Sequence, residues 1–486
     1  MRRLILGPPG TGKTTTLLDL VDRYIGQGVP PDRIAFLAFT RAAASEAVAR
    51  AVTRFNVPAS SFPYFRTLHS LAYRMLGLGK HEVMSAVEWE QFADAQHLDL
   101  RIEHRKPQYL WETPTNAHGP GNEALRCYQL ARARCVTIEQ EWMAGGYEAP
   151  LWFVQRFVQA LDAFKHERML LDYSDFLDQL TSPLDVDVVI VDEAQDLTQQ
   201  QWRLLSRLSS RARDVIFAGD DDQAIYQWAG ADLQELLRTP WERRVLPLSY
   251  RLSQPVKDLA ERIISKSAKR FDKVFRAAGH AGRVEALPVQ EIEVGEGSWL
   301  FLARTNAQAS SMLGIARDSG RVYEHNGLRS TNTPAVKAVL AYQDLIHGRA
   351  IKVAAWDALK RHASTCAGVT HVGLREVHPH ALPAHVQEWL VRAEPWYTAL
   401  QIPLKEATYI RSLLRRGEKL DAPANVRVMT VHQAKGLEAD NVVLFGKQHK
   451  HTGANEEEEV RIWYVGATRA RRRLILTHHE DNRWLM

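Results

Sequence analysis

The stretch DVVIVDEAQD, residues 187–196, decides the fold that we expect for this chain. An apolar run rich in β-branched residues, 186–191, ends here in two adjacent carboxylates, Asp192 and Glu193. Such runs are typical of buried strands in a parallel sheet, and parallel sheets carry their chemistry where the strands end. The sequence therefore predicts an α/β fold with acidic side chains at the carboxyl end of a central strand.

Two further predicted strands end in polar and aromatic residues. They lie in VIFAGDDDQAIYQWAGAD (215–232) and in LPLSYRL (246–252), and we expect the second to end at Tyr250 and Arg251. The side chains that follow these strands are Gln223, Tyr226, Trp228, Tyr250 and Arg251. This series of amide, aromatic and guanidinium groups beside the carboxylates predicts a site that senses a nucleotide phosphate and adjoins groups that stack on bases.

A phosphate-binding loop is predicted near the start of the chain. The segment GPPGTGKTTTLLDLV (7–21) follows a short apolar strand at 3–6, and it fits the pattern G-x-x-x-x-G-K-[ST]. In this pattern backbone N–H groups bind phosphate oxygens, Lys13 neutralises phosphate charge and the Thr14 hydroxyl binds Mg²⁺. Together with Asp192 as a partner of the metal ion, the loop predicts a nucleotide-hydrolysing protein.

Bulk properties fit a multidomain enzyme. At 486 residues the chain is expected to form about two to four domains. It is 45% hydrophobic and 24% charged, with a net charge of +5 that is compatible with nucleic acid. No apolar run approaches the length of a transmembrane helix or a signal peptide. The three cysteines lack zinc or redox spacing, so we expect reduced thiols and a cytoplasmic location.

The motifs divide the chain into two α/β cores, each interrupted by a mainly helical insertion. A second α/β pattern begins near Val245 and includes expected strands at 299–303 and 426–430. The predicted boundaries are 1–76 and 171–244 for the first core, 77–170 for its insertion, 245–333 and 421–486 for the second core, and 334–420 for a second insertion.

Three weaker signals have competing interpretations. Thr40-Arg41 and the Thr67–His69 segment end predicted strands and could hold a nucleic-acid phosphate, although Thr40 is at least as well explained as a helix N-cap. A metal site is also conceivable among Cys366, His371, His378, His380 and His385. Solvent-exposed loop histidines are the favoured interpretation, because a metal site needs a tighter ligand set.

The ordered motifs resemble those of the UvrD/Rep/PcrA-like superfamily 1A DNA helicases across nearly the whole chain. The motifs that carry the resemblance are GPPGTGKTT, FTRAAASEA, TLHS, VDEAQD, GDDDQAIYQWAGAD, SYR, TVHQAKGLE and YVGATRA. The resemblance implies two RecA-like P-loop cores with parallel sheets, ATP in the cleft between them, and Mg²⁺ held by Thr14 and Asp192. The family's 2B subdomain is expected to be reduced, because the interval 252–430 is short.

The resemblance also assigns roles at the nucleotide. Glu193 would position and deprotonate the attacking water, and Gln223 would sense the γ-phosphate. Arg251 and Arg469, both expected in the second core, would neutralise charge in the transition state together with Lys13. Tyr250 would stack on adenine, and Glu438 would contact the sugar or phosphates. The nucleotide-binding set is Gly7, Pro8, Pro9, Gly10, Thr11, Gly12, Lys13, Thr14, Thr15, Tyr250, Arg251, Glu438 and Arg469.

A single-strand track is implied as well. The matching residues are Phe39, Thr40, Arg41, Thr67, His69, Tyr226, Trp228 and His432. Stacking of a base on an aromatic ring is worth about 1–3 kcal/mol, and a DNA base-pair step averages about 1.4 kcal/mol. Moving one base past Trp228 per ATP would therefore compete on equal terms with one base pair at a fork.

We expect an ATP-dependent helicase that translocates 3′ to 5′ on single-stranded DNA, the polarity resting on the resemblance alone. The alternatives are a translocase that remodels protein–DNA complexes but unwinds weakly, suggested by Ala229 where the family has arginine, and a nucleotide-gated single-strand binding module. An RNA substrate is a further alternative. The expected partners are single-stranded and forked DNA and a single-strand-binding or replication/repair protein, with no membrane.

Overall fold

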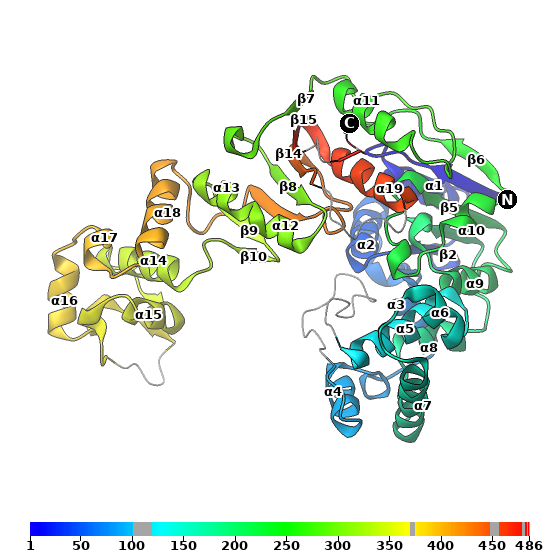
Figure 1. The fold of residues 1–486 in the computed structure, drawn as a ribbon, viewed down its shortest axis with the longest axis horizontal. Helices are drawn as coiled ribbons and strands as arrows, with labels where there is room; N and C mark the ends of the chain where they lie inside the picture. Colours follow the sequence, from blue (N-terminus) through cyan, green and yellow to red (C-terminus); the bar gives the residue numbers. More distant parts are fainter. Residues whose placement is uncertain (101–118, 370–374, 448–455, 479–481, 484, 486) are drawn as a thin grey trace. The chain divides into compact units, whose positions relative to one another are not determined.

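The computed structural model describes residues 1–100, 119–369, 375–447, 456–478, 482, 483 and 485. The chain separates into two compact units, and Figure 1 colours them along the sequence. Unit 1 comprises Met1–Leu252, Ser267–Gly279 and Glu456–Arg461. Unit 2 comprises Ser253–Lys266, His280–Asn455 and Ile462–Met486.

Unit 1 is built on a six-stranded parallel sheet with the strand order β3-β2-β4-β5-β1-β6. The strands are β1 (Arg2–Leu6), β2 (Ile34–Ala38), β3 (Phe65–Thr67), β4 (Val188–Val191), β5 (Asp214–Gly219) and β6 (Glu242–Val245). Every residue of β4 is buried, as its β-branched composition predicted. The carboxylates that follow β4 therefore lie at the centre of one edge of the sheet.

Alternate residues of these strands enter two hydrophobic cores, one on each face of the sheet. Ile5, Phe36 and Ile190 pack against α1 (Lys13–Gly26) and α2 (Arg41–Phe55). Leu4, Leu37 and Val189 belong to the other core. That core also contains residues of α3 (Leu68–Met75), α8 (Tyr173–Gln179), α9 (Gln199–Leu208) and α10 (Leu233–Arg238).

The prediction that a strand ends at Tyr250 and Arg251 is wrong. Strand β6 ends at Val245, after which the Leu246 N–H still donates to the Leu6 carbonyl at 2.9 Å. Pro247 has no N–H to continue the ladder, and the segment that follows leaves the sheet.

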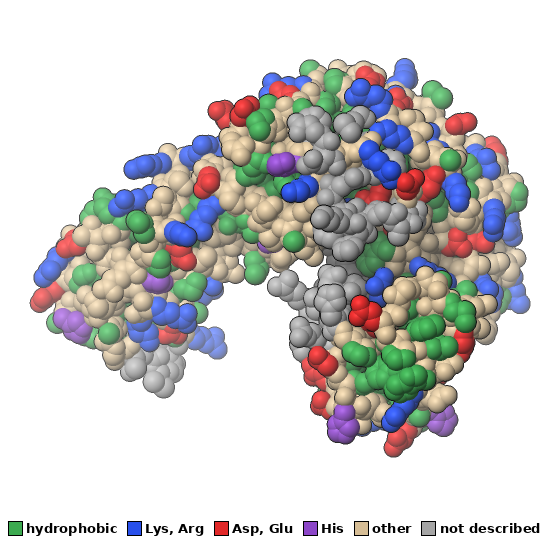
Figure 2. Space-filling model, in the orientation of Figure 1, with side chains coloured by type: hydrophobic (Ala, Val, Ile, Leu, Met, Phe, Trp, Pro, Cys, Tyr) green, Lys and Arg blue, Asp and Glu red, His purple; other side chains and the backbone are tan. Residues whose placement is uncertain are grey.

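A helical segment of unit 1 has a hydrophobic core of its own. It contains α4 (Ala86–Ala95), α5 (Pro120–Arg134), α6 (Ile138–Gly145) and α7 (Leu151–Arg168), with Phe92, Tyr128, Phe157 and Leu161 in the core. Figure 1 shows these helices grouped together, and Figure 2 shows hydrophobic side chains gathered on the visible face of the group.

Unit 2 is built on a seven-stranded sheet with the order β10-β9-β13-β8-β14-β15-β7. All of its strand pairs are parallel except β9 with β10. The strands are β7 (Arg283–Ala286), β8 (Trp299–Ala303), β9 (Tyr323–His325), β10 (Leu328–Arg329), β13 (Val426–Thr430), β14 (Ala439–Phe445) and β15 (Ala470–Thr477). The accompanying helices are α11 (Gln254–Ile264), α12 (Asn306–Ser311), α13 (Leu313–Asp318) and the second half of α19 (Glu456–Ala467), whose first residues, Glu456–Arg461, belong to unit 1.

A second helical segment lies within unit 2 and also has its own core. Its helices are α14 (Pro334–Ile346), α15 (Val353–Lys360), α16 (Ala384–Val391), α17 (Trp396–Ala399) and α18 (Leu404–Arg415). The short strands β11 (Ile351–Lys352) and β12 (Glu376–Val377) form an antiparallel pair beside them. Tyr342, Trp356 and Ile410 are among the buried residues that hold these helices together.

The predicted fold class is confirmed, since two largely parallel sheets with mainly helical additional segments are the arrangement expected of two RecA-like cores. None of the helices in the described part of the chain has the length and apolar character needed to cross a membrane.

Candidate active site

The phosphate loop connects β1 to α1 in unit 1. Gly10 and Gly12 have φ angles of 72° and 75°, in the left-handed region that favours glycine. A Cβ atom at Gly7 would lie 1.9 Å from Cγ of Lys13, so no larger residue fits there. The N-cap residue of α1 is Gly12, so no side chain caps the N–H groups of the first turn. The loop therefore has the backbone geometry that binds phosphate.

Four predicted site residues meet beside this loop. Lys13 Nζ lies 3.2 Å from Glu193 Oε1, and the Thr14 hydroxyl donates to Asp192 Oδ2 at 3.0 Å. Glu193 has φ 56° and ψ 41°, a left-handed conformation that costs a non-glycine residue free energy. The turn directs the Glu193 carboxylate to the Lys13 ammonium and leaves the Asp192 carboxylate on the Thr14 hydroxyl.

Burial and charge shift the pKa values of this cluster. Burial, aided by the negative charge of Glu193, raises the pKa of Asp192 to about 6. Burial alone would lower the pKa of Lys13, but the charges of Glu193, Asp192 and Asp220 outweigh burial and raise it. Lys13 is therefore a permanent cation, and the Asp192 carboxylate is poised to gain free energy from a further cation.

Replacement of Asp192 by Asn is expected to stabilise the nucleotide-free fold at pH 7. Because the folded-state pKa lies above the ordinary value, the cost of ionising this carboxylate in the folded protein is complete above about pH 6 and is lost as the pH falls toward 3.8. A shift from 3.8 to about 6 corresponds to roughly 3 kcal/mol at pH 7 and about half of that at pH 5.

Urea unfolding of wild type and Asp192→Asn at both pH values, without nucleotide or divalent ions, would measure this difference. An advantage of the variant that grows as the pH falls would contradict the assignment.

A further predicted residue, Gln223, is joined to Glu193 through two residues that the sequence did not single out. The Gln223 amide donates to Asp220 Oδ2 at 2.6 Å, and the Asp220 N–H donates to Gln195 Oε1 at 3.0 Å. Gln195 in turn donates from Nε2 to Glu193 Oε2 at 2.5 Å. Gln195 and Asp220 are both 0% exposed. Their positions directly after buried strands were the available signal.

The segment Ser249–Arg251 lies against the phosphate loop although it is not a strand. Ser249 Oγ donates to the Pro9 carbonyl at 2.7 Å, and the Tyr250 N–H donates to the Gly10 carbonyl at 2.8 Å. A Cβ atom on Gly10 would lie 2.3 Å from Cβ of Arg251. We predicted Arg251 in the second core, whereas it lies in unit 1, next to the boundary at Leu252. The Tyr250 side chain is 67% exposed and available to a ligand.

Three predicted residues belong to unit 2. Arg469 is 1% exposed, and its guanidinium donates to the carbonyls of Val465 and Leu437 at 2.9 and 3.2 Å. Glu438 is exposed and lies 3.5 Å from Arg471, while His432 is half-buried. Their roles at a nucleotide or on DNA stay predictions.

Predicted single-strand contacts in unit 1 form an aromatic group. The rings of Phe39 and Tyr226 stack with centroids 5.8 Å apart, and the Tyr226 and Trp228 rings lie 6.4 Å apart. Tyr226 is only 3% exposed, so Trp228 and Phe39, both half-buried, offer more ring surface. The hydroxyls of Thr40 and Thr67 accept hydrogen bonds from the N–H groups of residues 43 and 70, so both residues are helix N-caps.

Arg41, Thr67 and His69 line a pocket of about 1000 Å³ on unit 1, mostly among apolar residues of α2, β3 and α3. Burial lowers the pKa of His69 to about 4, and the charge of Arg41 contributes. His69 is therefore neutral at pH 7 and would meet a ligand through a neutral ring nitrogen.

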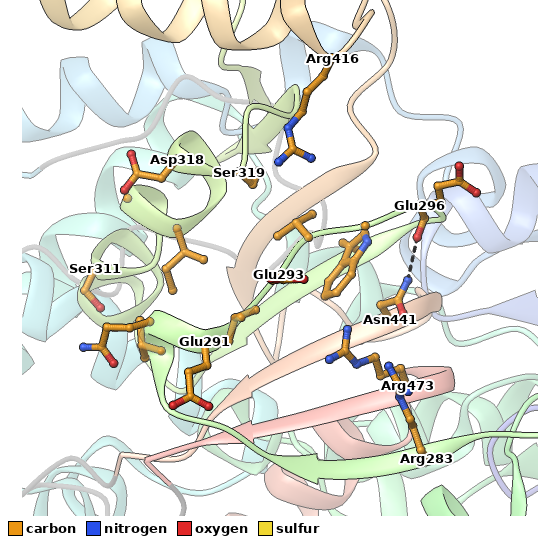
Figure 3. Close-up of a pocket in the computed structure, with 18 residues that line it drawn as sticks. Arg283, Glu291, Glu293, Glu296, Ser311, Asp318, Ser319, Arg416, Asn441 and Arg473 are labelled. Atoms are coloured by element: carbon orange, nitrogen blue, oxygen red, sulfur yellow. Dashed lines mark hydrogen bonds between the residues drawn. The ribbon is translucent and has the colours of Figure 1, made fainter.

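A second pocket, of about 1080 Å³, lies on unit 2 and contains none of the predicted site residues. Figure 3 shows its charged lining, in which Arg283 and Arg473 lie near each other and the Asn441 amide donates to the Glu296 carbonyl at 3.2 Å. Both basic and acidic side chains line this pocket, so its charge favours neither an anionic nor a cationic ligand.

The histidines of 371–385 form no metal site among the residues that the structure describes. No group of three or more His, Cys, Asp or Glu side chains in that part of the chain is arranged to hold an ion. His378 and His380 are exposed with ring centroids 5.3 Å apart, Cys366 is buried, and His371 lies outside the described residues.

Comparisons with known proteins identify the family of this chain. Residues 2–241 match the model of the UvrD/REP helicase N-terminal domain, and residues 384–481 match that of the UvrD-like helicase C-terminal domain. The chain is 22% identical to the putative ATP-dependent DNA helicase YjcD of Bacillus subtilis, over 98% of this chain and 76% of that protein. Its identity to ATP-dependent DNA helicase UvrD2 of Mycobacterium tuberculosis is 26%, over 97% and 76%. For DNA helicase II of Escherichia coli it is 22%, over 99% and 82%.

Among solved structures, an arterivirus nonstructural protein 10 helicase is similar, with a TM-score of 0.36 and 11% identity. The match covers 99% of this chain, which spans 60% of that structure. The two domain models together account for most of this chain, including the phosphate loop and the carboxylates that follow β4. The chain belongs to the UvrD/Rep helicase family of ATP-hydrolysing DNA helicases.

Proposed function

We propose that this protein hydrolyses ATP to move 3′ to 5′ along single-stranded DNA and to unwind duplex ahead of it. The observation that carries the coupling of hydrolysis to DNA is the hydrogen-bonded series from Lys13 through Glu193, Gln195 and Asp220 to Gln223, while the polarity rests on the family resemblance. Trp228 follows Gln223 in the segment after β5. A movement of Gln223 at the phosphate would therefore displace chain only a few residues from a ring that can stack on a base.

Magnesium fits the residues beside the phosphate loop. The Thr14 hydroxyl and the Asp192 carboxylate are 3.0 Å apart, and hard oxygen ligands of this kind suit Mg²⁺ bound together with phosphates. The raised pKa of Asp192 also indicates a carboxylate that lacks a sufficient countercharge. When bound, the ion would supply positive charge at the phosphate oxygens.

Hydrolysis would use the side chains that meet in unit 1. Lys13 would bind phosphate oxygens, while Glu193 would orient the attacking water and accept its proton. The Gln223 amide would contact the γ-phosphate. We further propose that Arg251 and Arg469 stabilise the transition-state charge, that Tyr250 stacks on adenine, and that Glu438 contacts the nucleotide.

DNA would follow the aromatic group and the strand ends of unit 1. Trp228 and Phe39 offer stacking surface, and Arg41 is exposed beside the pocket that Thr67 and His69 line. We propose the same use for Thr40, Tyr226 and His432. The two helical segments, 77–170 and 334–420, are proposed to be insertions into the two cores. A single-strand-binding or replication/repair protein is proposed as a partner.

Replacement of Trp228 by Ala is expected to weaken binding of oligo-dT by about 1–3 kcal/mol, or about 5- to 150-fold, because one stacking platform is lost. Fluorescence anisotropy with a labelled oligonucleotide measures the effect. Trp152→Ala is the matched control, since that tryptophan lies on α7 and is 63% exposed. Equal affinities in the two variants would remove Trp228 from the DNA track.

The decisive experiment is steady-state ATP hydrolysis with and without oligo-dT, followed by unwinding of duplexes with a 3′ or a 5′ single-stranded tail. Strong stimulation by DNA and unwinding only from the 3′ tail are expected. Stimulation without unwinding would favour a translocase that remodels protein–DNA complexes. DNA binding without hydrolysis would favour a nucleotide-gated binding module, and stronger stimulation by oligo-U would favour RNA.

A further inference from the structure

Three consecutive carboxylates are buried beside the candidate active site. Asp220, Asp221 and Asp222, here called the carboxylate cluster, are 0%, 0% and 1% exposed. Buried carboxylates this close to one another cannot all ionise unless cations compensate them. The compensating charges come from a distant part of the sequence, the Ser267–Gly279 segment of unit 1.

Lys273 lies at the centre of the carboxylate cluster. Its ammonium is 2.7 Å from Asp220, 2.5 Å from Asp221 and 2.8 Å from Asp222, and its side chain is 1% exposed. Burial by itself would lower the pKa of Lys273, but the three carboxylates outweigh burial and raise it. The lysine is therefore charged at neutral pH.

A second cation, Arg270, has a different position. Its guanidinium donates two hydrogen bonds to Asp222, at 2.8 and 2.7 Å, and its side chain is 21% exposed. Lys273, in contrast, donates to Oδ1 of Asp220, and Oδ2 of the same carboxylate accepts from Gln223. Both cations therefore compensate the negative charge of the carboxylate cluster, and Lys273 also contacts Asp220.

Asp220 is hydrogen-bonded toward both Gln223 and Glu193. Its carboxylate oxygen Oδ2 accepts from the Gln223 amide, and its backbone N–H donates to Gln195, which in turn donates to Glu193. An Asp220 side chain that rotated or took up a proton would release Gln223 from its present orientation. The other oxygen of this carboxylate accepts from the Lys273 ammonium at 2.7 Å and, over a longer distance of 3.3 Å, from the Asp222 N–H.

We propose that Lys273 is a positioning residue for ATP hydrolysis, which holds the Asp220 carboxylate so that the Gln223 amide is directed to the γ-phosphate. The proposal rests on the proposed function, in which Gln223 and Glu193 act on the nucleotide. Lys273 itself touches no reacting atom.

The test compares steady-state ATP hydrolysis, with oligo-dT present, for Lys273→Met and for the matched control Arg270→Met. Each variant removes one cation that compensates the carboxylate cluster, and both are expected to have a lower melting temperature than wild type. Lys273→Met is expected to lower kcat about 10- to 100-fold, with KM for ATP within about twofold of wild type, because misplaced groups slow the chemical step. Arg270→Met is expected to keep kcat within about twofold of wild type.

A charge-balanced variant separates positioning from simple compensation of charge. Lys273→Met combined with Asp221→Asn removes one cation and one anion, while the Asn oxygen can still accept from the Phe271 N–H, as Asp221 does at 2.7 Å. Its melting temperature is expected to recover toward wild type while kcat stays low.

Recovery of kcat in the double variant, or equal loss of kcat in Lys273→Met and Arg270→Met, would overturn the proposal. Failure of both lysine variants to fold would overturn it too, since the ion pair would then be a requirement of the fold. Wild type and Glu193→Gln are measured in the same assay. A wild-type protein without ATP hydrolysis would refute the proposed function, independently of Lys273.

Discussion

Replacement of Glu193 by Gln is expected to lower kcat for ATP hydrolysis by about 10²–10⁴-fold, the usual contribution of a positioned general base. Glutamine keeps the length of the side chain and can still accept a hydrogen bond from Gln195, but it cannot take a proton from water. The loss should therefore fall on kcat, with ATP still bound. Steady-state hydrolysis with saturating oligo-dT measures kcat, and a non-hydrolysable ATP analogue measures binding.

The matched control is Glu242→Gln. Glu242 is also paired with a cation, Arg3 at 3.0 Å, but it is exposed on β6. Its variant is expected to hydrolyse ATP at the wild-type rate. If Glu193→Gln kept kcat within threefold of the control, another group would have to act as the base.

Replacement of Lys13 by Met is expected to lower hydrolysis by about 10²–10³-fold, the usual cost of removing one preorganised donor from a transition-state charge. The Lys13 ammonium lies 3.2 Å from Glu193, at the junction of the phosphate loop and α1. Without it, the ionised form of Asp192 loses a stabilising charge, so the pKa of Asp192 is expected to rise further.

Unlike Glu193→Gln, this variant should also bind nucleotide more weakly, because Lys13 contacts the bound phosphates before the reaction as well as during it. Isothermal titration with the ATP analogue would separate the two effects. Arg23→Met, at the exposed end of the same helix α1, is the control and should behave as wild type. Unchanged nucleotide affinity in Lys13→Met would place the phosphates elsewhere.

One hydrogen-bonded network contains both active-site substitutions. Lys13 contacts Glu193, which is connected through Gln195 and Asp220 to Gln223. Effects of residues in one network seldom add, so the loss in a Lys13→Met, Glu193→Gln double variant is expected to be smaller than the product of the two single losses.

The sequence by itself determined the α/β class, the phosphate loop and the strand that carries Asp192 and Glu193. These features follow from local rules, since glycine spacing fixes the loop at Gly10 and Gly12, and a β-branched apolar run fixes β4. Threonine caps at Thr40 and Thr67 are local in the same way. A short segment of chain contains all the information for each of them.

Only the tertiary structure decided how these parts are joined. Nothing near Asp220 in the sequence indicates that Lys273 compensates it, because the two residues are 53 positions apart and meet through folding of the Ser267–Gly279 segment onto unit 1. The end of β6 at Val245, and the packing of Ser249 against Pro9, likewise depend on neighbours distant in the chain. Local patterns specify backbone conformation, whereas compensation of buried charge depends on which distant groups the packed core brings within hydrogen-bonding distance.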